Sequence, residues 1–219
     1  MAGEDQERIY REQANGYDDA ALEIEWQGPS LVFGLMSGFI RPGQTILDIG
    51  IGTGLGSEPF FQAGLRVVGI DVSEEMLDAC RKKGFAACLL RHDLTVVPYP
   101  FGDGTFDHAI STGVFHFFHD LDVVFREVAR ILPEGGRFAF VTGDRNPEEP
   151  AEIVAGPEQT GTGRSVTMFL HTPGQIAGWL EKNGFMLADS VEFTVWMDEK
   201  RSKEFPARAY LAQKRPEGQ

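Results

Sequence analysis

The sequence predicts an α/β fold with one doubly wound, mainly parallel sheet. Short apolar runs of strand length alternate with segments of helical periodicity, an order typical of parallel strands joined by crossover helices. The chain has 219 residues, of which 42% are hydrophobic and 24% are charged. It is therefore long enough for one sizeable core, and its composition is ordinary for a globular protein.

The first segment of the chain differs from the rest. Residues 1–29 are polar and charged, and a Gly-Pro pair closes them. We interpret residues 1–29 as an N-terminal cap and residues 30–219 as the main domain. At residues 30–40, apolar residues recur at helical spacing, which predicts a helix.

The main domain then shows strands and helices in turn. A turn precedes the apolar run 45–49, which has the length of a buried parallel strand. A short helix is predicted over residues 55–62, and a second strand over residues 65–70. The next helix has clear boundaries, because Ser73 is a good N-cap and Gly84 favours a helix end.

The second half continues this order but contains one irregular stretch. Residues 143–163 are rich in proline and glycine, which indicates a functional loop rather than core structure. The other predicted elements are strands at 85–90, 106–112 and 137–142, a helix at 120–132, an extra strand at 165–171, a helix capped by Thr172 and ending at Gly184, and antiparallel strands at 185–196 and 208–214.

Charge and cysteine content exclude several classes of function. Twenty basic and 33 acidic residues give a net charge of −13, which repels a phosphate backbone, so nucleic acid is not an expected substrate. Neither a signal peptide nor a run long enough to span a bilayer is present, so we expect a cytoplasmic protein with no membrane association. The two cysteines, Cys80 and Cys88, form no zinc or disulfide pattern.

The strongest functional signal follows the strand at 45–49. Gly50, Gly52 and Gly54 stand at alternate positions between this strand and the next helix. Glycines remove Cβ atoms where a ligand must lie against the backbone, and the N-terminus of the helix offers free amide donors. The glycines with both flanking elements predict a nucleotide site rather than a merely tight turn.

The spacing of the glycines narrows the choice of nucleotide. A dinucleotide fingerprint would need Gly or Ala where the sequence has Leu55 or Ser57. A phosphate loop ending in Gly-Lys-Ser/Thr is also absent. Asp71 ends the second strand, where an acidic residue can accept hydrogen bonds from both ribose hydroxyls. Its alternative role as a helix cap is disfavoured, because Ser73 already fills that position.

The glycine run with Asp48 before it resembles the first motif of class I S-adenosylmethionine-dependent methyltransferases. Residues 93–94, 99–107 and 129–136 are similar to later motifs of the small-molecule, type 11 group, which includes the ubiquinone and menaquinone methylating enzymes. This resemblance covers residues 44–143. It implies a three-layer, Rossmann-like sheet of seven strands with the last one antiparallel, and S-adenosylmethionine as the cofactor.

The resemblance also implies a set of cofactor contacts. Gly50, Gly52 and Gly54 would face the cofactor, with Asp48 near its methionine amino group. The other implied contacts are Tyr17 over the cofactor carboxylate, Asp71 at the ribose, Val72 and Met76 beside the adenine, Asp93 and Leu94 at the adenine amino group, and Thr112 at the methionine portion.

The sequence after the fourth strand bears on the acceptor. Residues 111–114 read Ser-Thr-Gly-Val, unlike the Asn/Asp-Pro-Pro-Tyr run of methyltransferases that act on adenine or glutamine amides. We therefore expect a small-molecule acceptor, cationic or neutral because of the acidic field, although a basic peptide would also suit it. The cap at 1–29 and a lid-like insertion at 143–171 would cover it.

Three histidines are candidate catalytic bases. A base is needed only if the acceptor arrives protonated. His116 and His119 follow the fourth strand and His171 precedes the capped helix, so each could face the acceptor. The alternative for the first two is an aromatic or interfacial position beside the neighbouring phenylalanines. No metal is expected, because a third ligand at suitable spacing is missing.

Two other functions stay open. A non-enzymatic sensor or partner subunit that binds S-adenosylmethionine would need the same pocket as an enzyme. An NAD-dependent oxidoreductase is disfavoured by Leu55 and Ser57.

Overall fold

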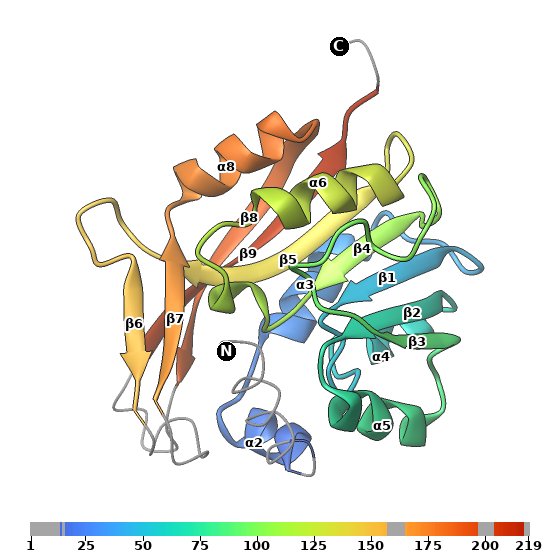
Figure 1. Ribbon diagram of the computed structural model, residues 1–219, viewed down its shortest axis with the longest axis horizontal. Helices are drawn as coiled ribbons and strands as arrows, with labels where there is room; N and C mark the ends of the chain where they lie inside the picture. Colours follow the sequence, from blue (N-terminus) through green and yellow to red (C-terminus); the bar gives the residue numbers. More distant parts are fainter. Residues whose placement is uncertain (1–13, 15, 157–164, 197–203, 217–219) are drawn as a thin grey trace.

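The computed structural model describes residues 14, 16–156, 165–196 and 204–216. Helices cover both faces of a nine-stranded sheet (Figure 1). The strands are β1 (Thr45–Ile49), β2 (Arg66–Asp71), β3 (Cys88–Arg91), β4 (His108–Ser111), β5 (Arg137–Asp144), β6 (Glu152–Ala155), β7 (Val166–His171), β8 (Phe185–Trp196) and β9 (Glu204–Lys214). The helices are α2 (Tyr17–Glu23), α3 (Gly28–Met36), α4 (Glu58–Gln62), α5 (Glu74–Lys83), α6 (Asp122–Ile131) and α8 (Pro173–Lys182), with a 3-10 turn η1 (Phe115–Phe117).

The sheet has the expected parallel centre and antiparallel edge. Strands β3, β2, β1, β4 and β5 lie side by side in that order and are parallel. Strand β9 runs antiparallel to β5 on one side and to β8 on the other. The predicted α/β class and the antiparallel last strand are therefore confirmed.

The predicted number of seven strands is wrong, because β6 and β7 enlarge the sheet. Strand β7 pairs in parallel with only Gly143 and Asp144 at the end of β5, and β6 pairs antiparallel with β7. The extra strand expected at 165–171 is thus present. Strand β6 was missed, because four strand residues stand inside a stretch that proline and glycine make irregular.

Two helix boundaries follow the predicted chemistry. The Ser73 hydroxyl accepts a hydrogen bond from the Met76 amide at the start of α5, and Gly84 ends this helix with φ +73°. Thr172 and Gln175 form a capping box at the start of α8, in which each side chain accepts from the backbone N–H of the other. These caps satisfy amides that the first helical turn leaves unpaired.

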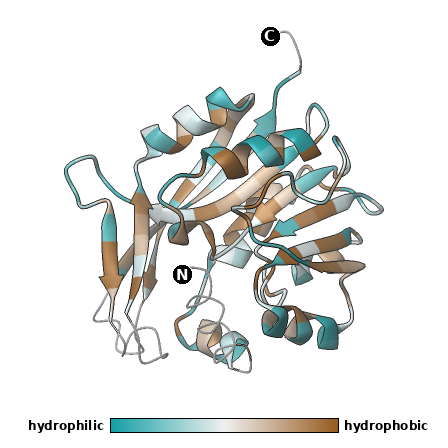
Figure 2. Cartoon of the chain, viewed as in Figure 1, coloured by the Kyte–Doolittle hydropathy of each residue, from teal (hydrophilic) through white to brown (hydrophobic). Residues whose placement is uncertain are grey.

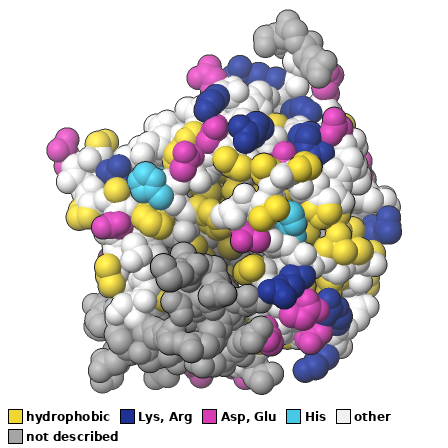
Figure 3. Space-filling view, viewed as in Figure 1, with side chains coloured by type: hydrophobic (Ala, Val, Ile, Leu, Met, Phe, Trp, Pro, Cys, Tyr) yellow, Lys and Arg dark blue, Asp and Glu magenta, His cyan; other side chains and the backbone are white. Residues whose placement is uncertain are grey.

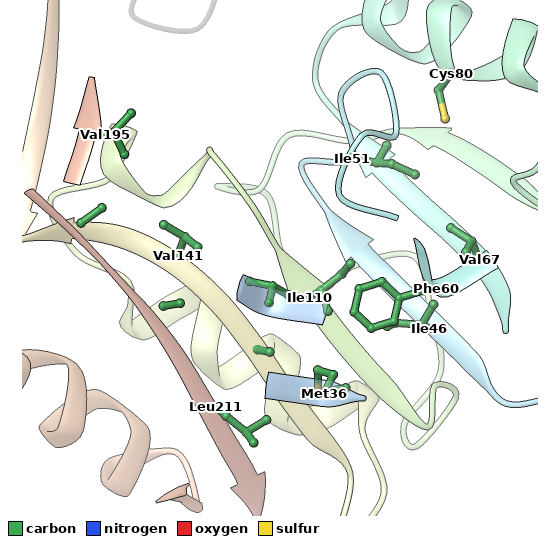
Figure 4. Close-up of a cluster of buried hydrophobic side chains, with 14 of the residues drawn as sticks. Met36, Ile46, Ile51, Phe60, Val67, Cys80, Ile110, Val141, Val195 and Leu211 are labelled. Carbon is green, nitrogen blue, oxygen red and sulfur yellow. The ribbon is translucent and has the colours of Figure 1, made fainter. Parts of the chain in front are cut away.

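Each face of the sheet carries its own hydrophobic core. On one face, α3, α4 and α5 pack on the sheet in a core that includes Ile46 and Val67 of the strands and Phe60 of α4 (Figure 4). On the other face, α6 and α8 cover a core rich in phenylalanine, in which Phe138 and Phe140 stack with their ring centroids 4.6 Å apart. Figure 2 shows the central strands as largely hydrophobic and α5 as largely hydrophilic. Both cores hold the carboxyl ends of the parallel strands in place.

The two segments expected to cover the site lie partly outside the described residues. Of the cap, residues 14 and 16–29 are described and include α2; of the insertion at 143–171, residues 157–164 are not described. Figure 1 shows α2 and the β6–β7 hairpin projecting from the sheet in the lower half of the view. None of the described helices has the length and apolar character needed to cross a membrane.

Candidate cofactor and acceptor site

A cavity of about 540 Å³ opens at the carboxyl ends of the parallel strands, and we call it the main cavity. Ligands bind at this end of open α/β sheets, at the point where the strand order reverses. That point lies between β1 and β4 in this sheet. The main cavity is lined by Tyr17, Trp26, Gly50, Ile51, Gly52, Thr53, Leu55, Gly56, Asp71, Val72, Met76, Asp93, Leu94, Thr95, Thr112, Gly113, Val114, Phe117, Phe118 and His119.

The three glycines of the loop after β1 have different surroundings. All have positive φ, which favours glycine. A Cβ atom at Gly52 would meet nothing within 4 Å, so Gly52 leaves its space to the main cavity. A Cβ at Gly50 would lie 2.9 Å from the Val114 side chain, and one at Gly54 would lie 2.6 Å from the Phe85 ring. Gly54 therefore permits protein packing and does not line the cavity.

Asp71 holds the glycine loop against the end of β2. Its Oδ2 accepts a hydrogen bond from the Gly52 amide at 2.8 Å, and its Oδ1 accepts one from the Ser73 amide at 2.9 Å. Burial raises the pKa of this carboxyl group, while these backbone bonds oppose the shift. Each carboxylate oxygen has a second lone pair. Asp71 can thus orient the loop and still accept hydrogen bonds from a ribose.

Asp48 lies beneath the loop, not among the lining residues. It is 1% exposed, and its Oδ2 accepts a hydrogen bond from the Ser57 hydroxyl. Its Oδ1 has no hydrogen-bond partner among the described residues. Burial raises the pKa of Asp48 to about 7; the Ser57 hydroxyl opposes this shift and the Asp71 charge adds to it. Asp48 is therefore a buried acid that a nearby cationic group would favour in its charged form.

The main cavity also collects the other predicted contact residues. Val72, Met76, Asp93 and Leu94 all line it, as does Thr112 after β4. Asp93 is fixed by its own turn, because its Oδ1 accepts hydrogen bonds from the amide and the hydroxyl of Thr95. The structure thus places nine of the eleven predicted contact residues in one cavity, all except Asp48 and Gly54. Their cofactor contacts remain predictions.

Tyr17 reaches the main cavity from α2. Burial raises its pKa to about 12, and the charges of Asp71, Asp18 and Asp48 add to this effect. Its hydroxyl is therefore protonated at neutral pH and can donate a hydrogen bond. The neighbouring Asp18 accepts from the Thr53 hydroxyl at 2.6 Å and pairs with Lys83 Nζ at 2.5 Å. These bonds tie α2 to the glycine loop and to α5.

The structure separates the three candidate histidines. Only His119 lines the main cavity. His116 packs against Phe117, with 4.1 Å between ring centroids, and burial, followed by the charge of His171, lowers its pKa to about 4. His171 is 2% exposed, and its Nδ1 lies 2.9 Å from the Thr142 hydroxyl. Burial lowers the pKa of His171 too. His116 and His171 are thus not among the residues that line the main cavity, and a catalytic role for any of the three histidines stays a prediction.

Comparison with known proteins identifies the central part of the chain. A family model described as a methyltransferase domain matches residues 47–140. Malonyl-(acyl-carrier protein) O-methyltransferase of Serratia marcescens is 32% identical over 130 residues, which are 59% of this chain and 49% of that protein. Demethylmenaquinone methyltransferase of Thermobifida fusca is 32% identical over 120 residues, 52% and 50% of the two chains.

The chain contains a class I S-adenosylmethionine-dependent methyltransferase domain. An S-adenosylmethionine-dependent methyltransferase from Mesorhizobium loti has the same fold, with a TM-score of 0.65 and 25% identity; the match covers 83% of this chain and 96% of that one. The chain spans about half the length of the curated relatives it matches. The domain match leaves out Tyr17, Trp26 and His171.

Several residues around the methyltransferase domain's cavity were missed in the sequence. Trp26 lines it from the segment between α2 and α3, and Leu55, Val114, Phe117 and Phe118 complete an apolar wall. The dense run of aromatic residues at 115–118 was a usable signal, because rings next to a strand end are candidates for a ligand wall. No comparable signal marked Trp26.

Proposed function

We propose that this chain is an enzyme that binds S-adenosylmethionine and transfers its methyl group to a small-molecule acceptor. The observation that carries the proposal is the open space at Gly52 beside the Asp71 carboxylate. A nucleoside can lie against the backbone there while its ribose hydroxyls donate to the carboxylate. Bound S-adenosylmethionine would supply an electrophilic methyl group, whose bond to sulfur breaks with its electron pair staying on sulfur as the acceptor's lone pair attacks the carbon.

The residues of the chain would bind and align the reactants. Asp71 would hold the ribose, and the protonated Tyr17 hydroxyl would donate to the methionine carboxylate. The buried Asp48 would favour the positive charges of the cofactor from beneath the loop. The aromatic wall would exclude water from the reacting atoms, so catalysis rests mainly on alignment. Should the acceptor arrive protonated, His119 is the histidine in reach of the cavity.

The acceptor could be free or carried on a protein. One relative's name includes an acyl-carrier protein, and the other names demethylmenaquinone. We favour a small molecule, because the acceptor would have to reach the methyl group inside a cavity of about 540 Å³ whose lining includes several apolar side chains.

Calorimetry and turnover together test this proposal. We expect S-adenosylmethionine and S-adenosylhomocysteine to bind, and NAD to bind at least about tenfold more weakly, a difference of about 1.4 kcal/mol. Equal or tighter binding of NAD would contradict the cofactor assignment. Conversion of S-adenosylmethionine to S-adenosylhomocysteine with an acceptor then separates an enzyme from a sensor, since a sensor would bind without turnover.

We also propose that the N-terminal cap and the insertion at 143–171 close over the site. Asp18 supports the first half of this idea, because its bonds to Thr53 and Lys83 attach α2 to the glycine loop. Phe169 of β7 supports the second, because its ring contacts the cavity residue His119 at 5.5 Å between centroids.

Asp18→Ala should loosen the cap without unfolding the domain. We expect affinity for S-adenosylhomocysteine to fall by about tenfold, since one charge-assisted hydrogen bond contributes about 1.5–3 kcal/mol, part of which solvent replaces. Hydrogen exchange should show lost protection at residues 16–23 when the ligand is bound. Asp19→Ala is the matched control, because Asp19 is exposed on the same helix. Equal affinities in both variants would mean that α2 does not act as a cap.

A further inference from the structure

One end of the main cavity is aromatic and is not used by the predicted cofactor contacts. Trp26, Phe117 and Phe118 line this end together with His119, and we call these four residues the aromatic end. They come from the segment before α3 and from η1 and the loop after it. Leu55 and Val114 add aliphatic surface. In Figure 3, hydrophobic side chains extend across the middle and right of the face shown, acidic atoms lie among them, and most of the basic side chains lie above and below them.

The rings of the aromatic end are held by their neighbours. A Cβ at Gly28 would lie 2.2 Å from Trp26 Cζ2, so the indole lies directly on the backbone of α3. The indole also packs against the Phe193 ring, 5.9 Å away between centroids. His119 packs edge-on against Phe169, and Phe117 packs on His116. Rings that are fixed before binding lose little entropy when a ligand packs against them.

The turn before Trp26 is set by the end of α2. Glu25 has φ 51°, the only positive φ at a non-glycine residue in the described parts of the chain. Its amide donates to the Leu22 carbonyl and the Trp26 amide donates to the Ala21 carbonyl, which is a common way for a left-handed residue to close a helix. These two bonds fix the direction in which the chain leaves α2, so they help to position the indole.

The charges around the main cavity disfavour a charged acceptor. Among the described lining residues neither lysine nor arginine occurs, so an anionic acceptor finds no cationic partner there. The carboxylates of the lining, Asp71 and Asp93, lie at the ribose and adenine side. A cationic acceptor at the aromatic end would lack a carboxylate and would face the sulfonium charge of the cofactor. Burying an unpaired charge is costly, whereas a neutral ring gains apolar contact.

We infer that the acceptor is an uncharged molecule that presents a flat aromatic ring to Trp26, Phe117 and Phe118. The inference rests on the proposed function, because it concerns the second substrate of the same site. The inference excludes two other classes of acceptor for this chain, namely carboxylates, such as a malonyl group, and amines.

Three probes of nearly equal shape test the inference. With the protein saturated by S-adenosylhomocysteine at about pH 8, 2-naphthol, 2-naphthoate and 2-naphthylmethylamine are titrated in turn. We expect the neutral naphthol to bind at least about tenfold tighter than the anion or the amine, because neither charge is compensated. Equal or tighter binding of either charged probe overturns the inference, and so does a failure of all three to bind.

Variants tie the binding to the aromatic end. Phe118→Ala should weaken naphthol binding by about tenfold, consistent with a lost ring contact of about 0.5–1.5 kcal/mol, and should weaken it more than it weakens S-adenosylhomocysteine binding. Phe61→Ala is the control, because this ring is 46% exposed and lies outside the main cavity. If S-adenosylhomocysteine itself fails to bind the wild-type chain, the proposed function falls. If it binds but Phe118→Ala and Phe61→Ala behave alike, only the acceptor inference falls.

Discussion

Replacement of Gly52 by valine should abolish detectable S-adenosylhomocysteine binding while the protein stays folded. The Gly52 Cβ position is open and faces the main cavity, so a valine side chain would occupy space that the ligand needs. We expect affinity to fall by at least about 100-fold, which corresponds to about 2.7 kcal/mol. The backbone at φ +54° adds a cost of about 1–2 kcal/mol to folding, because a branched residue is strained in the left-handed region.

A second glycine separates the two effects. Gly84 also has positive φ and open space at its Cβ position, but it lies at the end of α5, outside the cavity lining. Gly84→Val should therefore lose similar stability in urea unfolding and keep its affinity in calorimetry. Retained binding in Gly52→Val would mean that the ligand does not lie against this loop. A parallel loss of affinity in both variants would assign the effect to unfolding.

Asp48→Asn should change stability in opposite directions at low and high pH. The folded-state pKa of Asp48 is raised from 3.8 to about 7. The free energy of unfolding of the wild-type protein therefore falls as the pH rises from about 4 to about 7, and above pH 7 the whole loss is present. This cost is about 4 kcal/mol. Asparagine carries no charge and avoids this cost. Its buried side-chain amide donor would have no acceptor, however, which costs about 1–3 kcal/mol. We expect the variant to be more stable by about 1–3 kcal/mol at pH 8 and less stable at pH 4.

Urea unfolding at both pH values measures this reversal. Ser57→Ala is the matched control, because it removes the hydroxyl that favours the charged form of Asp48 and should lower stability at pH 8. Calorimetry should show that Asp48→Asn binds the cationic S-adenosylmethionine more weakly, with a smaller effect on S-adenosylhomocysteine, which lacks the sulfonium charge. A variant that is less stable at pH 8 as well would refute the buried-charge explanation.

Local signals predicted most of the fold correctly. Strand β1 and strand β8 have the predicted bounds, and the caps at Ser73 and Thr172 form the predicted hydrogen bonds. The residues that determine these strands and caps lie within a few positions of one another in the sequence. The additional strand β6 could not be predicted in this way, because its four residues become a strand only by pairing with β7, which follows them across a loop.

The site could be predicted from the sequence where residues of the predicted motifs contact one another directly. Gly52 and Asp71 come from two neighbouring strand ends, and the Gly52 amide donates a hydrogen bond to the Asp71 carboxylate across the loop. Gly54 and Asp48 have the right spacing but face the protein interior, since tight packing by Phe85 and Ser57 takes their side of the loop. The motif at residues 99–107 is likewise structural: Arg130 donates to the Phe101 carbonyl at 2.8 Å and pairs with Asp103.

The position of β9 has a consequence for biosynthesis. This strand is made last of the nine, yet it lies between β5 and β8, and it pairs with β8 along its whole length and with β5 at residues 207–213. Until residues 204–214 leave the ribosome, β5 and β8 each have an unpaired edge. The Phe140 ring also lacks the Tyr210 ring that stacks on it. Unpaired edges of this kind template pairing between chains. The nascent protein therefore has an open β5 edge from the time residue 144 is made until residues 204–214 follow, and a chain that ends before residue 204 would keep the edges of both β5 and β8 open to pairing with other chains.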